Sequence, residues 1–278
     1  MIIDFHTHVF PEEVRGNREV FFSSEPDFKL LYQAPNAKLA NDKDLLKMMD
    51  EDRVDCSVLM GFPWKSIRMC RAHNDYILSL VSEYPERFIG FCCVDPFHRQ
   101  SLEEIKRCRE NGIRGVGEFG FYRTGITEEV LDRLQPIMDY CEVYRLPVVI
   151  HTNEPIGHAY PGKMPVSIRD IYRLVERFQD VTLILAHWGG GAFFFNLLKK
   201  EVKGVFRNVY VDTAASPFLY DPKVYEVAVR ILGSRKILFG SDFPLLRPAR
   251  YFRELDTVFL APDDRKNILG RNAAELIQ

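Results

Sequence analysis

Short apolar runs alternate with segments of helical periodicity along most of this 278-residue chain. Runs such as Val148-Val149-Ile150 are apolar on both faces, which is typical of parallel strands covered by helices. We therefore predict eight strands, near residues 2–6, 56–61, 88–94, 115–119, 147–151, 182–187, 209–213 and 237–241.

Segments with apolar residues at helical spacing separate these strands. They lie near residues 42–52, 70–84, 101–111, 128–144, 167–178, 191–204, 221–231 and 247–260. Two helix starts have the spacing of a capping box, Ser101 with Glu104 and Ser167 with Asp170. Repeated strand–helix units over this length predict a single-domain α/β fold, a (β/α)8 or TIM barrel. A doubly wound open sheet is the structural alternative.

One connection is much longer than the others. Residues 9–41 follow the first strand and contain five aromatic residues, namely Phe10, Phe21, Phe22, Phe28 and Tyr32. Because long connections in compact domains are usually functional, we predict a lid-like insertion here. Nothing in residues 1–278 indicates a linker or a second domain.

Composition excludes several classes of partner. The 37 basic and 39 acidic residues give a net charge of -2, which argues against binding to nucleic acid or an anionic membrane. Met1 runs directly into the first strand without a signal peptide, and no apolar stretch reaches membrane-spanning length. The six cysteines contain no CxxC pair, and we expect them to be reduced. We expect a cytoplasmic protein with a small-molecule substrate, and a homo-oligomer is left open.

The first strand carries the most informative motif, Asp4-Phe5-His6-Thr7-His8. Side chains alternate along a strand, so His6 and His8 point the same way, with Asp4 behind them. Two imidazoles at one strand end can bind a single divalent ion. The alternative is a pair of core histidines satisfied by hydrogen bonds.

Four later strands also end in a potential metal ligand. Glu118 ends the fourth, His151 the fifth and His187 the sixth, and Asp242 follows the eighth. A barrel gathers such groups at one face, where its active site lies. In contrast, His73 lies in a helical segment, and we expect it at the solvated surface.

Taken together, these pieces resemble a known family. The matching segments are Asp4-Phe5-His6-Thr7-His8, His151, Ala186-His187, Phe239-Gly240-Ser241-Asp242-Phe243-Pro244 and Ile268-Leu269-Gly270-Arg271-Asn272-Ala273. They resemble the amidohydrolase superfamily of TIM-barrel metal-dependent hydrolases. The branch is the amidohydrolase-2 type, which includes aminocarboxymuconate semialdehyde decarboxylase. The resemblance covers essentially the whole chain.

The resemblance implies roles for the strand-end residues. His6, His8 and Asp242 would bind a metal, with His151 as a fourth ligand. His187 would bind a second metal or activate the metal-bound water, and Asp242 would be the general acid and base. Zinc suits these ligands and activates water, so we expect one or two divalent ions, zinc first, with manganese or another ion as alternatives.

Glu118 decides how many ions are expected. Many two-metal members of the superfamily bridge their ions with a carboxylated lysine on the fourth strand. This chain has a glutamate there, similar to the TatD-type nucleases, whereas one-metal members, the decarboxylase among them, lack a bridging group. We therefore list Glu118 as a metal ligand. The alternative is that it orients a ligand histidine or meets an arginine.

Loops after the strands supply possible substrate contacts. We predict that His158, Arg123, Trp64 and Asn153 bind the substrate. The leading hypothesis is a metal-dependent hydrolase acting on an amide, lactone or ester of a small polar or anionic substrate. The alternative is a metal-dependent non-oxidative decarboxylase of a small unsaturated or aromatic carboxylic acid. Hydrolysis of DNA is less favoured, because the chain has no sign of a basic groove. A barrel that binds a metal or ligand without turnover is also less favoured, because it should have lost Asp242 or one of the histidines.

Overall fold

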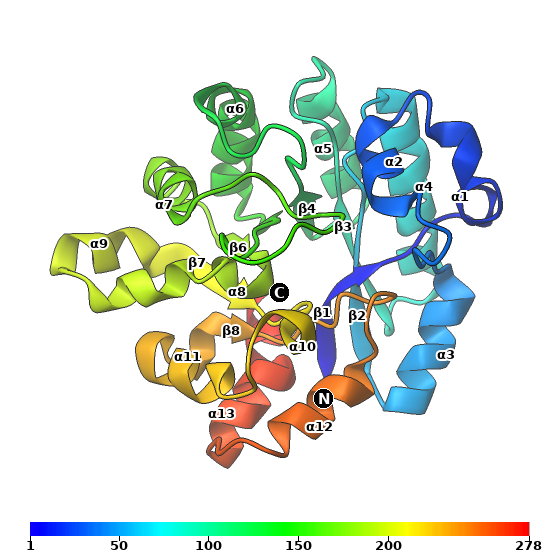
Figure 1. The fold of residues 1–278 in the computed structure, drawn as a ribbon. Helices are drawn as coiled ribbons and strands as arrows, with labels where there is room; N and C mark the ends of the chain where they lie inside the picture. Colours follow the sequence, from blue (N-terminus) through cyan, green and yellow to red (C-terminus); the bar gives the residue numbers. More distant parts are fainter. Residues whose placement is uncertain (278) are drawn as a thin grey trace.

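Eight parallel strands, hydrogen-bonded in chain order, form the centre of the computed structural model, which describes residues 1–277 (Figure 1). They are β1 (Ile3–His8), β2 (Cys56–Met60), β3 (Phe88–Cys92), β4 (Gly115–Phe119), β5 (Val148–Ile150), β6 (Leu183–Leu185), β7 (Val209–Asp212) and β8 (Ile237–Leu238).

Backbone hydrogen bonds join the end of this sheet to its beginning. The amide of Phe5 donates to the Phe239 carbonyl at 2.7 Å, and the amide of Asp242 donates to the His6 carbonyl at 2.9 Å. These bonds bring the region after β8 beside β1, so the sheet is a nearly closed barrel. The prediction of a TIM barrel is confirmed, and the open-sheet alternative is excluded.

Helices surround the barrel, as the ring of coiled ribbons in Figure 1 shows. The main ones are α3 (Asp42–Asp52), α4 (Ile67–Glu83), α5 (Ser101–Glu110), α6 (Glu128–Tyr144), α7 (Ile168–Arg177), α11 (Val224–Leu232) and α12 (Pro248–Leu255). Shorter ones are α8 (Ala186–Gly189), α10 (Ser216–Leu219), α13 (Pro262–Lys266) and α14 (Asn272–Leu276), with the 3-10 turns η3 (Phe206–Asn208) and η4 (Ser234–Lys236) and the π-helical turn η5 (Asn267–Arg271). No helix among residues 1–277 has the length and apolarity to cross a membrane.

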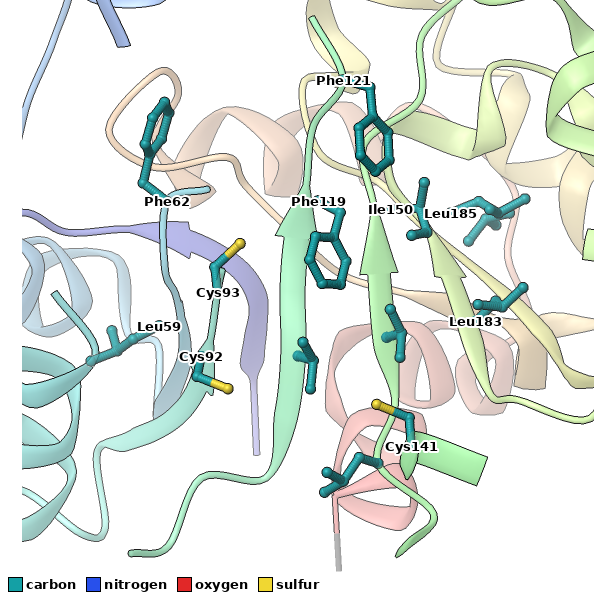
Figure 2. Packing of buried hydrophobic residues seen from close by; sticks show 14 of the residues in the cluster. Leu59, Phe62, Cys92, Cys93, Phe119, Phe121, Cys141, Ile150, Leu183 and Leu185 are labelled. Carbon is teal, nitrogen blue, oxygen red and sulfur yellow. The ribbon is translucent and has the colours of Figure 1, made fainter. Parts of the chain in front are cut away.

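Side chains alternate between the inside of the barrel and the layer under the helices. Phe119, Ile150 and Leu185 are paired in register on β4, β5 and β6, and all three are fully buried in the outer layer (Figure 2). Phe5 and Phe91 pack within the barrel, with ring centroids 5.6 Å apart. This double burial explains why the strands read as continuous apolar runs.

The predicted capping boxes have different outcomes. Ser167 and Asp170 form the reciprocal bonds at the start of α7, as predicted. The prediction for Ser101 and Glu104 is wrong, because the Ser101 hydroxyl donates to the Asp95 carbonyl at 2.5 Å instead. The Glu104 carboxylate accepts from Arg107, so it is not available to the helix start.

The segment after β6 also differs from the prediction of one helix over 191–204. It contains the 3-10 helix η2 (Ala192–Leu197) and the short helix α9 (Lys200–Val205). Between them Leu198 is extended, with φ -75° and ψ -174°, which ends the first helix. Gly189, Gly190 and Gly191 all have positive φ and fix the chain direction before η2.

Residues 9–41 are folded against the barrel end. They form α1 (Glu12–Gly16), η1 (Arg18–Phe21) and α2 (Pro26–Tyr32). We call the rings of Phe10, Phe28, Phe62, Trp64 and His73 the aromatic cluster. Its closest pair is Phe28 and Trp64, with centroids 4.7 Å apart. That this segment acts as a lid stays a prediction.

The expectation of a surface position for His73 is wrong. Its side chain is buried, and its Nε2–H donates to the Val9 carbonyl at 2.7 Å. The Trp64 indole N–H donates to His73 Nδ1 at 3.0 Å. Burial lowers the pKa of His73 to about 4, so the ring is neutral at pH 7. The apolar spacing of α4 through Cys70, His73 and Ile77 shows why this position faces inward.

Candidate metal centre

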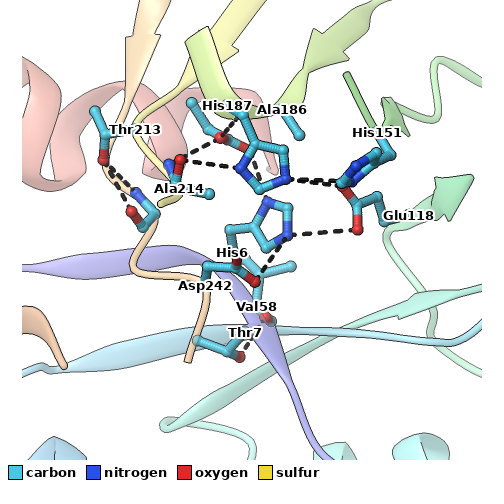
Figure 3. Close-up of polar contacts among 12 residues, drawn as sticks. His6, Thr7, Val58, Glu118, His151, Ala186, His187, Thr213, Ala214 and Asp242 are labelled. Atoms are coloured by element: carbon cyan, nitrogen blue, oxygen red, sulfur yellow. Dashed lines mark hydrogen bonds and ion pairs between the residues drawn. The ribbon is translucent and has the colours of Figure 1, made fainter. Parts of the chain in front are cut away.

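The carboxyl ends of the strands bring all six predicted metal ligands together. The imidazoles of His6, His151 and His187 point toward one another and toward the Glu118 carboxylate, with Asp242 beside His6 (Figure 3). His8 completes the set, since its Nε2 lies 3.1 Å from His6 Nε2. The six residues come from segments far apart in the chain, and only the barrel makes them neighbours.

One group of donors is centred on the first strand. Glu118 Oε2 lies 3.6 Å from His6 Nε2 and 3.7 Å from His8 Nε2. Asp242 Oδ1 lies 3.5 Å from His8 Nε2 and 3.9 Å from His6 Nε2. Two imidazole nitrogens and two carboxylate oxygens therefore face one small volume.

A second group uses the other oxygen of the same glutamate. Glu118 Oε1 lies 2.9 Å from His151 Nδ1 and 3.6 Å from His187 Nε2. These two nitrogens are 3.2 Å apart. The groups His6–His8–Glu118 and Glu118–His151–His187 each have the spacing of a possible metal site, and they share Glu118.

Hydrogen bonds on the outer side fix which nitrogen of three rings faces the centre. His6 Nδ1 donates to Asp212 Oδ2 at 2.8 Å, and His187 Nδ1 donates to the Ala214 carbonyl at 3.0 Å. His151 Nε2 donates to the Gly162 carbonyl at 2.9 Å. In the neutral rings the opposite nitrogen then presents a lone pair to the centre.

This donor set fits a divalent cation. Lone pairs and carboxylate oxygens converge within about one hydrogen-bond length of each other, and acceptors that face acceptors repel unless a positive charge lies between them. Imidazole nitrogen with carboxylate oxygen is a ligand set that suits zinc, manganese and iron. The described residues could therefore hold a divalent metal ion.

The pKa shifts reflect this crowding. Burial disfavours a charged His6 ring, but the Asp212 and Glu118 carboxylates outweigh it and raise its pKa well above the usual range. Burial, reinforced by His6, lowers the pKa of His8 to about 4. For Glu118, burial is opposed by His151 and His6, which together hold its pKa well below the usual range. Glu118 is therefore ionised within the centre.

Asp212, at the end of β7, was missed in the sequence. Its side chain is fully buried, and besides its bond to His6 it accepts at Oδ1 from the amides of His187 and Ala214, at 2.9 and 3.0 Å. One carboxylate thus orients ligands from two strands. Its position at a strand end was the available signal, because the other strand-end carboxylates were chosen on that ground.

Backbone strain is concentrated around the centre. His187, Trp188 and Asp242 have φ of 56°, 60° and 61°, in the left-handed region that is unfavourable for residues with a Cβ. Strained residues persist where surrounding contacts over-determine them, and they cluster at functional sites. The backbone N–H of Asp242 donates a hydrogen bond to the His6 carbonyl, and this bond holds the Asp242 carboxylate beside the histidines.

Three of the four predicted substrate contacts have protein partners, and the fourth is exposed. The Trp64 side chain is buried in the aromatic cluster, and the Asn153 amide is bonded to the backbone of Met164. Arg123 pairs with Asp27 of α2 at 2.5 Å, and His158 is exposed on the loop after β5. Their contact with a substrate stays a prediction.

Two tyrosines that the sequence reading missed lie near the centre. The Tyr122 ring centroid is 5.0 Å from that of His151. Burial raises the pKa of both Tyr122 and Tyr32, and the carboxylates of Glu118 and Asp242 add to the effect. Both phenols are therefore neutral. Tyr32 comes from α2, so residues 9–41 approach the metal centre.

Comparison with known proteins identifies the family of this chain and two relatives. A family model described as "Amidohydrolase" (Amidohydro_2) matches residues 3–278. The 2-amino-3-carboxymuconate-6-semialdehyde decarboxylase of Dictyostelium discoideum is 23% identical over 334 residues, covering 99% of this chain and 91% of that protein. The gamma-resorcylate decarboxylase of Rhodococcus jostii (strain RHA1) is 22% identical over 298 residues, covering 87% and 89%.

A solved structure shares the fold. It is the 5-carboxyvanillate decarboxylase of Novosphingobium aromaticivorans, crystallised with manganese and 4-hydroxy-3-methoxy-5-nitrobenzoic acid. The TM-score is 0.77 with 16% identity, and the match covers 100% of this chain and 96% of that one.

These relatives correct the functional prediction. The sequence led us to expect a hydrolase first, whereas both curated relatives are named decarboxylases. The hydrolase prediction is therefore wrong, and the findings favour its alternative. Glu118 had distinguished this chain from one-metal members such as the decarboxylase, but a strand-four carboxylate bears on how a metal is held rather than on which bond breaks.

Proposed function

The chain belongs to the amidohydrolase family, and from this premise we propose that it is a metal-dependent, non-oxidative decarboxylase of a small aromatic or unsaturated carboxylic acid. The observation that carries the proposal is the convergence of His6, His8 and Asp242 at the barrel's carboxyl face. The names of the two curated relatives, each matched over most of its length, supply the reaction class.

His6, His8 and Asp242 would hold a divalent ion, with His187 close to it. When bound, such an ion supplies Lewis-acid chemistry: it stabilises negative charge on a substrate oxygen. Zinc and manganese both suit these ligands. The manganese in the solved decarboxylase makes it the first ion to test.

The reaction requires one proton to be added to the substrate carbon that carried the carboxylate. The bond between the carboxylate and its carbon breaks, the electron pair stays on that carbon, the carbon takes up a proton, and carbon dioxide leaves. Asp242 is the best placed donor, because its side chain is 15% exposed while that of Glu118 is only 4% exposed. We assign the proton transfer to Asp242, which solvent then reprotonates.

His187 has a different task in this proposal. Its Nδ1–H is engaged by the Ala214 carbonyl, so only Nε2 is free on the inner side. That nitrogen is close to Glu118 and His151 rather than to solvent. We infer that His187 stabilises the negative charge of the centre through Nε2, and that Asp242 delivers the proton.

Glu118 is proposed to hold metal through both oxygens. Each oxygen faces a different histidine pair, so Glu118 can serve one ion or be shared between two. Metal content by plasma mass spectrometry on wild type and Glu118→Gln tests this. Two ions falling to one or none support a shared Glu118, and one ion in both proteins contradicts it. The exposed Glu129→Gln is a matched control.

Activity is tested by carbon dioxide release from a panel of small carboxylic acids, including γ-resorcylate and 5-carboxyvanillate, with manganese or zinc supplied. Wild type is expected to release carbon dioxide from at least one acid, and Asp242→Asn to lose this by at least about a thousandfold. Asp139→Asn, on the exposed side of α6, is the control. Release that does not depend on metal, or that survives in Asp242→Asn, contradicts the proposal.

A further inference from the structure

A cavity of about 240 Å³ lies on the outer side of the barrel, away from the metal centre. It opens between β7 and the broken segment η2–α9, on the side where α9 and α11 project in Figure 1. Phe193, Phe206, Val211 and Leu232 form its apolar lining. Asn196 of η2 and Lys203 of α9 both line the cavity, so it lies beside the break between these two helices.

The rest of the lining consists of Val209, Asn196 and three basic residues, with no acidic one: Lys203, Arg207 and Lys236. The guanidinium of Arg207 is already paired with Asp180 at 2.5 Å. Among residues 1–277, neither lysine has a carboxylate partner within ion-pair distance. The two lysines therefore leave unneutralised positive charge beside an apolar space.

Lys236 is the more informative of the two, because it is half-buried. Its ammonium donates to the Arg207 carbonyl at 2.7 Å and lies 4.2 Å from the Tyr210 ring centroid. An ammonium has three donors, and this carbonyl accepts from one of them. Burial lowers the pKa of Lys236, as expected for a cation with incomplete compensation. An anion at this position would neutralise the Lys236 ammonium and accept from its remaining donors.

The size and lining limit the occupant. An apolar cavity of roughly 150 Å³ is known to take up benzene, so this cavity has room for one ring with a short acidic arm. Phe193 and Phe206 offer aromatic surface on which a ring can pack. The lysines at the edge would receive a carboxylate.

The cavity is also connected to the metal centre through the backbone. Val211 lines the cavity, and the next residue, Asp212, points to the opposite face and binds His6. Phe193 follows the glycine turn that leaves His187. A ligand that shifts either wall would therefore act on residues that orient the metal ligands.

We propose that this cavity binds a small aromatic monocarboxylate as an effector, separately from the catalytic centre, and that its occupation changes metal affinity. The binding does not depend on the proposed decarboxylation. Coupling between two sites is reciprocal, so the carboxylate and the metal should change each other's affinity by the same factor.

Phenylacetate is the probe for binding, measured by calorimetry on the metal-loaded protein. Leu232→Trp fills the cavity, and Lys236→Met removes the charge. Each substitution should weaken the binding of phenylacetate at the cavity at least tenfold. Lys200→Met, on α9 but outside the cavity lining, should bind like wild type. Phenylacetamide, the neutral analogue, should also bind at least tenfold more weakly than phenylacetate.

Asp242→Asn separates this site from the catalytic one, because binding at the cavity should persist in that variant even if catalysis is lost. Equal affinity of wild type, Leu232→Trp and Lys236→Met for phenylacetate would overturn the site. Thermal unfolding checks that Leu232→Trp is folded, and Lys236→Met tests the site independently. Manganese affinity should change at least threefold at saturating phenylacetate, and no change would overturn the effector role.

Discussion

The metal centre and the aromatic cluster both lie at the carboxyl end of the barrel, but different forces organise them. In the metal centre, hydrogen bonds such as that from His6 to Asp212 hold each ring at a fixed angle around converging charge. In the aromatic cluster, packing dominates, with Phe28 and Trp64 in contact and fully buried. We expect mutations in the cluster to change stability and mutations in the centre to change metal affinity.

The largest effect is expected for Trp64→Ala in the aromatic cluster. Removing a fully buried tryptophan should lower the free energy of unfolding by about 3–5 kcal/mol, from lost burial and the cavity left behind. Denaturant unfolding measures this, with the exposed Phe259→Ala as control. Metal content should stay unchanged, and a variant that loses metal without losing stability would contradict the proposed separation.

His73 should make the cluster sensitive to acid. Its pKa is about 4 in the folded protein against 6.5 for the free side chain. Above pH 6.5 the ring is neutral in both states. Below that pH the unfolded chain takes up the proton first, so stability falls until the folded ring also titrates near pH 4. The loss should reach about 3 kcal/mol.

Comparing wild type with His73→Leu across this pH range isolates the effect. The variant should lose less stability on acidification than wild type, while the exposed His158→Leu should follow wild type. Parallel pH profiles for wild type and His73→Leu would show that His73 is not the group responsible.

Asp212→Asn tests the metal centre. The asparagine oxygen can still accept from the amides of His187 and Ala214, but its NH₂ group would face His6 Nδ1 as a donor. That favours the tautomer with hydrogen on Nε2, the nitrogen that should face the metal. We expect metal affinity to fall about 10–100-fold.

Chelator competition measures that affinity, and the exposed Asp221→Asn is the control. Thermal unfolding of Asp212→Asn without added metal is measured alongside, so that lost stability is separated from lost metal affinity. An affinity within threefold of wild type would mean that Asp212 does not orient His6.

The smallest effect is expected for the ion pair between Arg123 and Asp27, which links the loop after β4 to α2. Exposed pairs usually contribute about 0.2–1 kcal/mol, and Arg123 is 58% exposed. A double-mutant cycle with Asp27→Ala measures the coupling. If Arg123 instead contacts the substrate, KM should rise at least tenfold in Arg123→Ala but not in Asp27→Ala.

The pattern of strand ends made much of the metal centre predictable. Strand alternation placed His6 and His8 on one side, and the barrel topology brought Glu118, His151 and Asp242 to them. Asp212 could have been found by the same rule, but its hydrogen bonds depend on the positions of His6 and His187 in space. Sequence spacing carries no information on such contacts.

Other features depended on tertiary contacts that periodicity does not report. The residues 191–204 have helical spacing, yet the extended conformation of Leu198 breaks the helix. Trp64, a predicted substrate contact, is buried against Phe28 from a segment 36 residues earlier. Aromatic residues in a loop indicate apolar contact without indicating whether the partner is a ligand or the protein.

The closure of the barrel has a consequence for how the protein acquires its chemistry. The backbone hydrogen bond from Asp242 to His6 joins residues 236 positions apart. The pairing of β1 is therefore complete only when the region after β8 has folded beside it. Contacts of such separation form slowly, because a long loop must be closed first. Partly folded chains would therefore have His6 and His8 without Asp242, and the binding pocket for the metal would be completed only as the ring of strands closes.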